Sequence, residues 1–314
     1  SRIAGGLYNP VVLKRFSEIW KAKEQVDLVE SFYPVLEKKL GVTFDYKLPI
    51  YRKFASIEEQ NNWFQAADKP SLSDFLNTNL YNLGFTNINA SFGFGEVYKT
   101  GYLDIKAMVE AYSDYLKAQN LLIEESFNYS KVEFLANGLK YNAIEAKHIV
   151  FCEGFGLHAN PYFNDLPLDG TKGELLIIKA PELKLQAIVK SNIFILPIGN
   201  DRYKVGATYN WEDKTNLPTA NGKKELLQNL EELIACDYEV VAHFAGVRPT
   251  VKDRRPLVGT HYVHKQLHIL NGLGTRGVML GPFLAKQLFE YLENESALDK
   301  EIDINRFYKK RGLL

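Results

Sequence analysis

The chain has 314 residues and carries 38 Lys plus Arg against 38 Asp plus Glu, so its formal net charge is zero. The length allows about two domains and a substantial core. Balanced charge argues against a nucleic-acid partner, although a local basic patch remains compatible with it. No apolar run approaches the roughly 18 residues of a membrane span. Two cysteines, Cys152 and Cys236, form neither a disulfide framework nor a metal motif and fit a cytoplasmic location.

The N-terminal part of the chain predicts helices that alternate with extended segments. A helical pattern runs from Phe16 to Leu40, and Gly41 is a plausible stop. Residues 42–55 alternate loosely, as strands do. Ser56 followed by Glu59 then predicts a capping box for a helix over residues 56–68.

The middle of the chain predicts one helix and a series of short strands. Asp104 is expected to cap a helix with apolar positions from Ile105 to Leu116. The Asn137-Gly138 pair predicts a hairpin. The apolar run after His148 suggests a strand buried on both faces. The segments expected to be extended are 85–103, 121–125, 131–135, 139–146 and 148–154.

Residues 170–210 are rich in strand patterns. Turn signals at Ala180-Pro181 and at Gly199 to Asp201 separate three of these strands, which predicts an antiparallel meander. A helix is expected from Asn221 to Cys236.

The C-terminal quarter contains the most informative pattern. An apolar run from Leu267 to Leu270 predicts a buried strand, and a glycine-rich turn and a helical pattern follow it. The first amides of a helix have no partner within the helix and carry partial positive charge, so this element suits an anionic or electron-rich group. The glycines Gly272, Gly274 and Gly277 match G-x-G-x-x-G, but a polar, charged tail follows the helix. A dinucleotide fingerprint needs a further strand with an acidic residue, so we reject that interpretation here.

Strands and helices thus alternate at both ends of the chain and enclose a strand-rich block. We expect an α/β (α+β) fold, in which an incomplete Rossmann-like domain carries an inserted antiparallel β-sheet domain.

Four stretches, in order, resemble FAD-dependent oxidoreductases of the D-amino acid oxidase / glycine oxidase family. They are SRIAGGLYNP at the start, GYLDIKAMV from Gly101, HIVFCEGFG from His148, and the segment Ala245 to Pro282 with its VRP, its DRRPLVG and its glycine turn. The last stretch is the most specific. The departures from the family pattern are Ile105 in place of proline, and Cys152 and Glu153 in place of small residues.

The resemblance implies a bound FAD and a division of the chain. Neither cysteine lies in the segments of the signature nearest the flavin ring, so we expect the FAD to be bound non-covalently. The FAD-binding domain would comprise 1–41, 101–160 and 245–314, and the substrate domain 42–100 and 161–244. The family's first strand, glycine motif and helix, which hold the FAD pyrophosphate, would precede Ser1, and we expect that segment to have been cleaved or to be missing. The implied cofactor-binding residues are Arg2, Ala4, Gly5, Gly6, Gly154, Gly272, Leu273, Gly274, Thr275, Arg276, Gly277 and Val278.

The resemblance also implies oxidation of the amine of a small amino acid or related amino-carboxylate, with oxygen as the electron acceptor. Arg248 would hold the substrate carboxylate through its planar fork, and Arg276 would lie near the flavin and the substrate. Phe194 stands where glycine oxidases often carry a tyrosine, and it would form an apolar wall. Hydride transfer from a neutral amine needs no strong base, so we assign no catalytic residue and regard His243 as structural.

Each assignment has an alternative. Arg248 could instead form a surface ion pair with Asp253, and the basic residues Lys252, Arg254 and Arg255 could belong to a solvated loop. Two other functions stay open. One is flavin-dependent oxidation of a carboxymethyl-modified tRNA nucleoside, and the other is a relative that has lost its cofactor and its activity.

Overall fold

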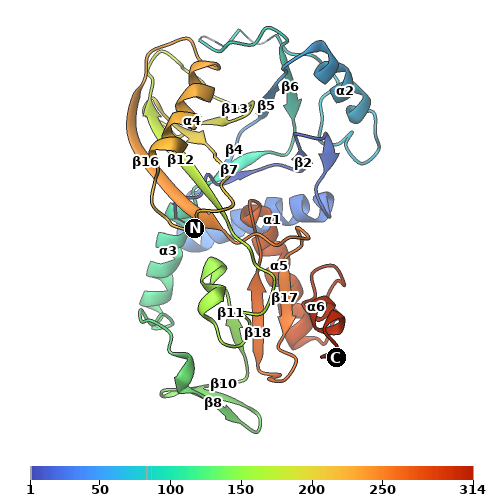
Figure 1. The fold of residues 1–314 in the computed structure, drawn as a ribbon, viewed down its shortest axis with the longest axis vertical. Coiled ribbons are helices and arrows are strands. Elements are labelled where there is room, and N and C mark those ends of the chain that lie inside the picture. Colours follow the sequence, from blue (N-terminus) through green and yellow to red (C-terminus); the bar gives the residue numbers. More distant parts are fainter. Residues whose placement is uncertain (1, 83, 86, 314) are drawn as a thin grey trace. The chain divides into compact units, whose positions relative to one another are not determined.

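The computed structural model describes residues 2–82, 84–85 and 87–313. Their contacts divide the chain into two compact units. Unit 1 comprises Ser1–Tyr115 and Lys172–Gly246, and unit 2 comprises Leu116–Thr171 and Val247–Leu314. Figure 1 shows the helices and strands of both units.

Unit 1 is built around a seven-stranded sheet with the order β16-β12-β15-β14-β13-β5-β6. Period-two alternation gives each strand two different faces. On one face, Leu176, Ile195 and Val205 belong to a core that also contains Leu226 and Leu230 of helix α4. The strands are β5 Ile50–Lys53, β6 Phe94–Val97, β12 Thr171–Lys179, β13 Ile188–Lys190, β14 Phe194–Pro197, β15 Arg202–Gly206 and β16 Glu239–Arg248, and α4 is Ala220–Glu231.

The predicted antiparallel meander is only partly correct. β13, β14 and β15 do pair in sequence, but β12 pairs with β15, and β13 pairs in parallel with β5. The long-range pairing of β5 places this strand inside the sheet, where the local turn signals could not locate it. Helix α4 also ends at Glu231, short of the predicted Cys236.

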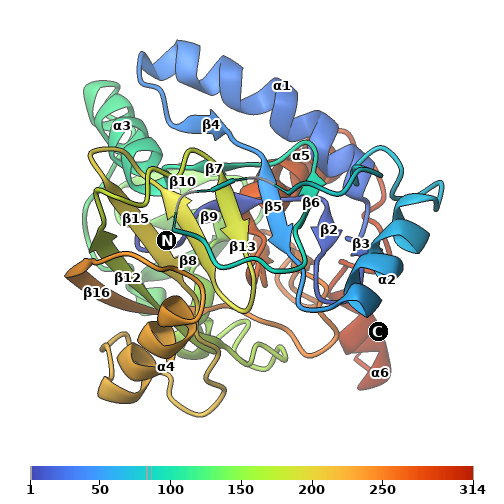
Figure 2. The same cartoon turned by 90° about the horizontal axis from the view of Figure 1, so that it is seen from above.

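The rest of unit 1 consists of small sheets and helices. α1 lies beside β4 (Figure 2) and ends at Gly41, whose φ of 69° is the left-handed conformation expected of a stop. The predicted helix over Phe16 to Trp20 is wrong, because this segment contains strand β3, paired with β2. The elements are β1 Leu7–Tyr8, β2 Val11–Val12, β3 Ser17–Glu18, α1 Ala22–Leu40, β4 Asp45–Lys47, α2 Ile57–Ala67, β7 Gly101–Leu103 and α3 Ile105–Ala118, whose end enters unit 2.

Unit 2 contains a three-stranded sheet in which β11 and β17 flank β18. β11 is parallel to β18, and β17 is antiparallel to it. Helix α5 packs on β17 and β18 (Figure 1). The elements are η1 Tyr129–Lys131, β8 Val132–Leu135, β9 Gly138–Tyr141, β10 Ile144–Ala146, β11 Ile149–Phe151, η2 Gly154–Ala159, β17 Leu257–Thr260, β18 Leu267–Asn271, α5 Gly277–Glu293 and α6 Asn305–Lys310.

Two predictions for unit 2 are wrong and two are confirmed. Residues 121–125 form no strand, and the side chains of Leu121 and Ile123 are largely exposed. β11 is an edge strand with Val150 39% exposed, so it is not buried on both faces. The hairpin of β8 and β9 is present. After α5 the described chain, to residue 313, contains α6 and no further strand, which supports the rejection of the dinucleotide fingerprint.

The expected mixed α/β class is confirmed. The contact-based units do not follow the predicted domain boundaries, because unit 1 contains both 1–41 and 42–100. The division into cofactor and substrate domains therefore stays a prediction.

Candidate functional site

Two glycine turns of unit 2 lie at the same edge of its sheet. β11 and β18 are parallel, so the turn at Gly154 and the turn that begins at Gly272 both follow carboxyl ends. The side chain of Asn271 connects them: its Nδ2 donates to the Gly154 carbonyl at 2.9 Å, and its Oδ1 accepts from the Gly272 amide at 2.7 Å. Ligands of open α/β sheets bind at this edge.

The backbone of these turns requires glycine at specific positions. Gly272 has a φ of 72°, and a Cβ there would lie 2.8 Å from Val251 Cγ2. Gly274 and Gly154 also have positive φ values of 56° and 58°, which side chains disfavour. Nothing in the structure comes within 4 Å of a Cβ built at Gly154, so this turn borders open space.

Helix α5 starts directly after the second turn. Its N-cap residue, Arg276, makes no side-chain capping hydrogen bond, and the first turn contains no acidic residue. The Arg276 amide donates to the Leu273 carbonyl at 3.1 Å, which closes the turn. The positive end of the helix dipole therefore lies behind the segment from Leu273 through Thr275 to Val278.

Arg248 is held next to the glycine turn by its neighbour. It is the half-buried last residue of β16. The carbonyl of Pro249 accepts from the Gly274 amide at 2.9 Å, and the carbonyl of Thr250 accepts from the Asp169 amide at 2.8 Å. Asp253, the alternative partner considered for Arg248, forms an ion pair with Arg306 at 3.0 Å.

The remaining predicted site residues lie in unit 1. Phe194 packs against two glycines, because a Cβ at Gly5 would lie 2.9 Å from its Cζ and a Cβ at Gly206 would lie 3.1 Å from it. Gly6, with a φ of 79°, accepts a backbone hydrogen bond from Leu103 at 2.9 Å. Arg2 and Ala4 are exposed.

The predicted residues thus form two groups. Phe194 contacts the segment that contains Gly5 in unit 1, and in unit 2 hydrogen bonds join the turns at Gly154 and Gly272 to each other and to Pro249, the residue after Arg248. The unit 2 group fits a flavin nucleotide, because it combines glycine turns, open space at Gly154 and a helix N-terminus. The described residues contain no cluster of three or more metal-ligating side chains.

Comparison with known proteins decides the family. The family model DAO, FAD dependent oxidoreductase, matches residues 4–291. The chain belongs to this FAD dependent oxidoreductase family. FAD is therefore the cofactor of the family, and the resemblance found in the sequence is confirmed.

Individual relatives of this family member are distant. It is 23% identical over 236 residues to glycine oxidase of Bacillus subtilis strain 168, a match that covers 70% of this chain and 63% of the relative. It is 25% identical over 138 residues to the tRNA 5-methylaminomethyl-2-thiouridine biosynthesis bifunctional protein MnmC of Idiomarina loihiensis, covering 42% of this chain and 22% of that protein. The chain therefore spans less than two thirds of the length of these curated relatives.

The fold is that of solved family members. The crystal structure of glycine oxidase from Geobacillus kaustophilus superposes with a TM-score of 0.76 at 18% identity, covering 95% of this chain and 86% of the other. None of the helices in the described ranges combines the length and hydropathy that a bilayer span requires.

Sequence reasoning missed a buried ionic network in unit 1 of this FAD dependent oxidoreductase. The Lys172 ammonium contacts Asp213 and lies 3.9 Å from Glu174. Glu174 accepts from the amide and hydroxyl of Thr219 at 2.9 and 2.7 Å and lies 2.7 Å from His243 Nε2. His243 thus lies against a buried carboxylate, and its structural role stays a prediction. The only sequence signal was a Lys and a Glu at alternate positions of a strand pattern.

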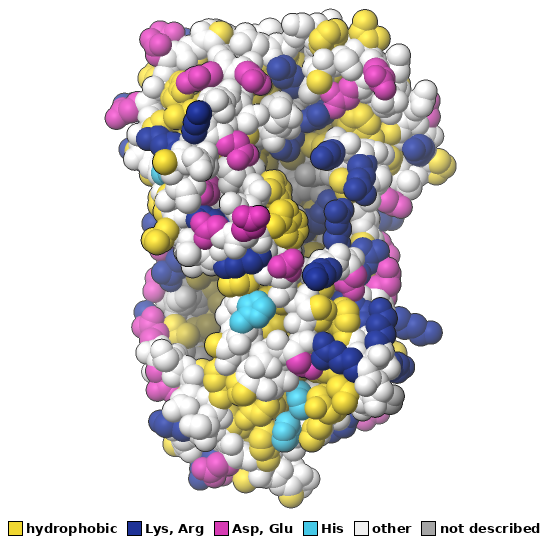
Figure 3. All heavy atoms as spheres, in the orientation of Figure 1, with side chains coloured by type: hydrophobic (Ala, Val, Ile, Leu, Met, Phe, Trp, Pro, Cys, Tyr) yellow, Lys and Arg dark blue, Asp and Glu magenta, His cyan; other side chains and the backbone are white. Residues whose placement is uncertain are grey.

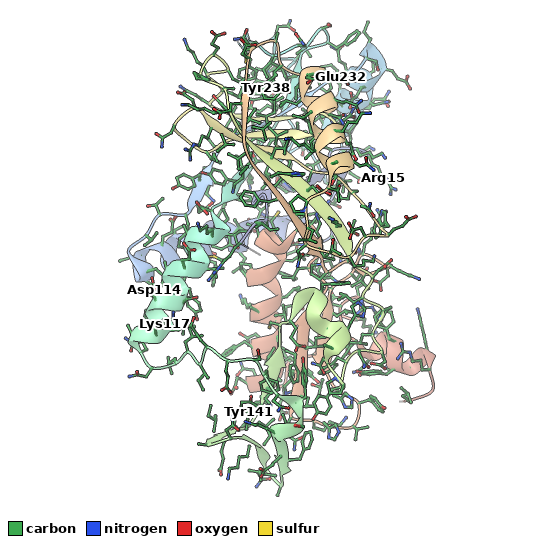
Figure 4. All side chains as sticks on the ribbon, turned by 60° about the vertical axis from the view of Figure 1, so that its left-hand side comes forward. Arg15, Asp114, Lys117, Tyr141, Glu232 and Tyr238 are labelled. Atoms are coloured by element: carbon green, nitrogen blue, oxygen red, sulfur yellow. The ribbon has the colours of Figure 1, made fainter. Side chains whose placement is uncertain are left out.

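A cavity of about 310 Å³ lies beyond the end of α4 in unit 1. Its lining includes Glu231, Cys236 and Tyr238. Figure 4 shows Tyr238 close to Glu232 at this end of unit 1. None of the predicted cofactor or substrate residues lines this cavity.

Proposed function

We propose that the chain acts as an FAD-dependent oxidoreductase that oxidises the amine of a small amino acid or a related amino-carboxylate. Bound FAD would supply the two-electron acceptor that takes a hydride from the carbon beside the nitrogen. The resulting imine would hydrolyse to a carbonyl compound and ammonia. Molecular oxygen is the proposed final acceptor, and a cytoplasmic location stays a prediction.

The hydrogen bond between Pro249 and Gly274 carries this proposal. It ties the residue after Arg248 to the turn that precedes α5. A guanidinium presents parallel donors to both oxygens of a carboxylate. Arg248 would therefore orient the substrate by its acid group, and Arg276 would add positive charge beside the same turn.

The glycine turns would hold the cofactor through backbone amides. The segment 272–278 and Gly154 supply these amides, and the α5 dipole would stabilise negative charge on the reduced ring. In unit 1, Gly5 and Phe194 would form part of the cofactor and substrate walls. An apolar ring at position 194 offers no hydrogen bond to a carboxylate, so we propose substrates larger than glycine.

The first test is flavin reduction with a series of amino acids. We expect anaerobic addition of the right substrate to bleach the flavin absorbance. Arg248→Gln should raise the substrate concentration for half-maximal bleaching about 100-fold, as expected for the loss of two charged hydrogen bonds. The exposed Arg202→Gln is the control and should have no effect. A full-length protein without flavin would refute the proposal.

A second candidate function is oxidation of a modified tRNA nucleoside. One observation favours it besides the similarity to MnmC. The loop that carries Lys252 and Arg254 is fixed to α6 by the Asp253–Arg306 ion pair, and α6 ends with Lys309 and Lys310. All four cations are exposed, and groups of Lys and Arg are visible on the surface (Figure 3).

Salt-dependent tRNA binding tests this candidate. Phosphate contacts would make log Kd rise steeply with log salt. Replacing Lys309 and Lys310 by Glu should then weaken tRNA binding and reduce the slope of log Kd against log salt concentration. The same replacement should leave oxidation of free amino acids unchanged. No tRNA binding at low salt would exclude this candidate.

A further inference from the structure

Asn271 is a buried residue whose side chain connects the two glycine turns. It is the last residue of β18 and is 2% exposed. Its two side-chain hydrogen bonds, to Gly154 and Gly272, use a donor and the acceptor of the amide. These contacts were not identified from the sequence.

The Asn271 side chain forms its hydrogen bonds beyond the last backbone pair of β11 and β18. The last paired residues of β11 and β18 are Phe151 and Ile269. Gly154 and Gly272 lie beyond this pair, in segments with positive φ values. Glycine has the largest backbone freedom of all residues, so the two turns need another constraint to keep a fixed separation.

We propose that Asn271 is a positioning residue that locks both turns into one preformed cradle for the cofactor. This rests on the proposed function. A cradle that is ordered in advance does not have to be ordered during binding, which favours tight association. Without the lock, the turn at Gly272 would move independently of the turn at Gly154, and binding would have to restore their alignment.

Two substitutions of Asn271 distinguish the contributions of its two side-chain hydrogen bonds. Asn271→Leu removes both hydrogen bonds and keeps a side chain of similar size. Asn271→Asp keeps the acceptor for the Gly272 amide and loses the donor to the Gly154 carbonyl. The matched control is Asn77→Leu in unit 1. Asn77 is also buried, accepts from the Asn79 amide and donates to Glu96, each at 2.9 Å.

The experiment combines FAD titration, followed by flavin fluorescence, with hydrogen exchange of the Gly272 amide. Asn271→Leu should weaken FAD binding about tenfold and speed exchange at Gly272 by a similar factor. Asn271→Asp should keep Gly272 protected but still weaken FAD binding. Asn77→Leu should lower the unfolding temperature without changing either quantity.

The outcomes separate the two proposals. Wild-type FAD affinity and wild-type Gly272 exchange in Asn271→Leu would overturn the positioning role. Equal loss of FAD affinity in Asn271→Leu and Asn77→Leu would also overturn it, because the effect would then be general instability. If the full-length wild-type protein does not bind FAD, the proposed function is not supported, and unchanged exchange at Gly272 in Asn271→Leu would then still refute the positioning role.

Discussion

The N-termini of helices α4 and α5 both carry the positive end of a helix dipole, but different groups lie against them. At α4, Thr219 accepts from the Gly222 amide at 3.0 Å, and Glu174 binds the amide and the hydroxyl of Thr219. At α5, the N-cap Arg276 makes no capping hydrogen bond through its side chain. The chain thus supplies its own anion to α4, and we propose that a flavin takes the corresponding place at α5.

Glycines lie both at the N-terminus of α4 and in the turn after β11, but their surroundings differ. A Cβ at Gly222 would lie 2.4 Å from Glu174 Cδ, so glycine there makes room for an internal carboxylate. A Cβ at Gly154 would meet nothing within 4 Å. The comparison teaches that one glycine can make room for an internal carboxylate while another leaves its backbone open, and that only the neighbours distinguish these cases.

Removing the internal anion should have the largest effect on stability. Glu174→Ala removes the buried carboxylate that accepts from Thr219 and lies beside His243, and leaves Lys172 with Asp213 alone. Loss of one member of a buried ion pair costs about 3–5 kcal/mol. Urea unfolding monitored by fluorescence should report this loss. The exposed Glu225→Ala on α4 is the control, with an expected change within about 0.5 kcal/mol. Equal effects of the two substitutions would contradict the role of Glu174.

The next prediction concerns the glycine turn before α5. Gly272→Ala should destabilise the protein by about 2–3 kcal/mol, because it places a Cβ at a φ of 72° and against Val251. Gly277→Ala should be nearly neutral, since its nearest neighbour would be 3.7 Å away. Thermal unfolding of both variants measures the difference. Similar melting temperatures would show that the turn tolerates a side chain.

Acid should weaken unit 2 through two histidines. Burial lowers the pKa of His268 to about 4 from 6.5, with a further contribution from His148, and burial lowers the pKa of His261 to about 4. Between pH 6.5 and pH 4 the unfolded chain binds protons that the folded chain does not, so stability falls as the pH falls. His268 alone contributes at most about 3 kcal/mol over this window.

Unfolding free energies measured between pH 7 and pH 4 test this expectation. His268→Gln should reduce the slope of the unfolding free energy against pH, because it removes a group that takes up a proton on unfolding. His268 also bonds Thr260 and His148, so the slope is the diagnostic quantity, whereas the absolute stability reports packing as well. An unchanged slope would rule out His268 as a source.

The smallest expected effect concerns a helix start that is capped in the ordinary way. Ser56 accepts from the Glu59 amide at 3.1 Å. Ser56→Ala should therefore cost about 1 kcal/mol, measured by chemical denaturation. Ser56→Asp should retain most of the stability because it restores an acceptor. A loss as large as that of Glu174→Ala would show that local capping and the buried network are equally important.

Local signals predicted the elements that depend on local chemistry. Gly41 ends α1 in the left-handed conformation, Ser56 caps α2, and an apolar run followed by glycines gives β18 and α5. These features depend on residues a few positions apart, so their sequence patterns suffice. The family could also be inferred, because the segment Ala245 to Pro282 keeps several motif positions in order.

Long-range packing decided what the local patterns could not. The helical spacing from Phe16 to Trp20 gave way to β3, paired with β2, and β5 joined β13 across a long stretch of sequence. The sequence around Glu174 did not indicate that its carboxylate binds Thr219 at the N-terminus of α4.

The sequence by itself thus determined elements such as α2, β18 and α5, the glycine turn and the family. Tertiary structure decided that Pro249 meets Gly274 and that Asn271 joins Gly154 to Gly272. The physical reason is that a hydrogen bond between distant segments depends on where the whole chain places its donor and its acceptor, and no short window of residues encodes that placement.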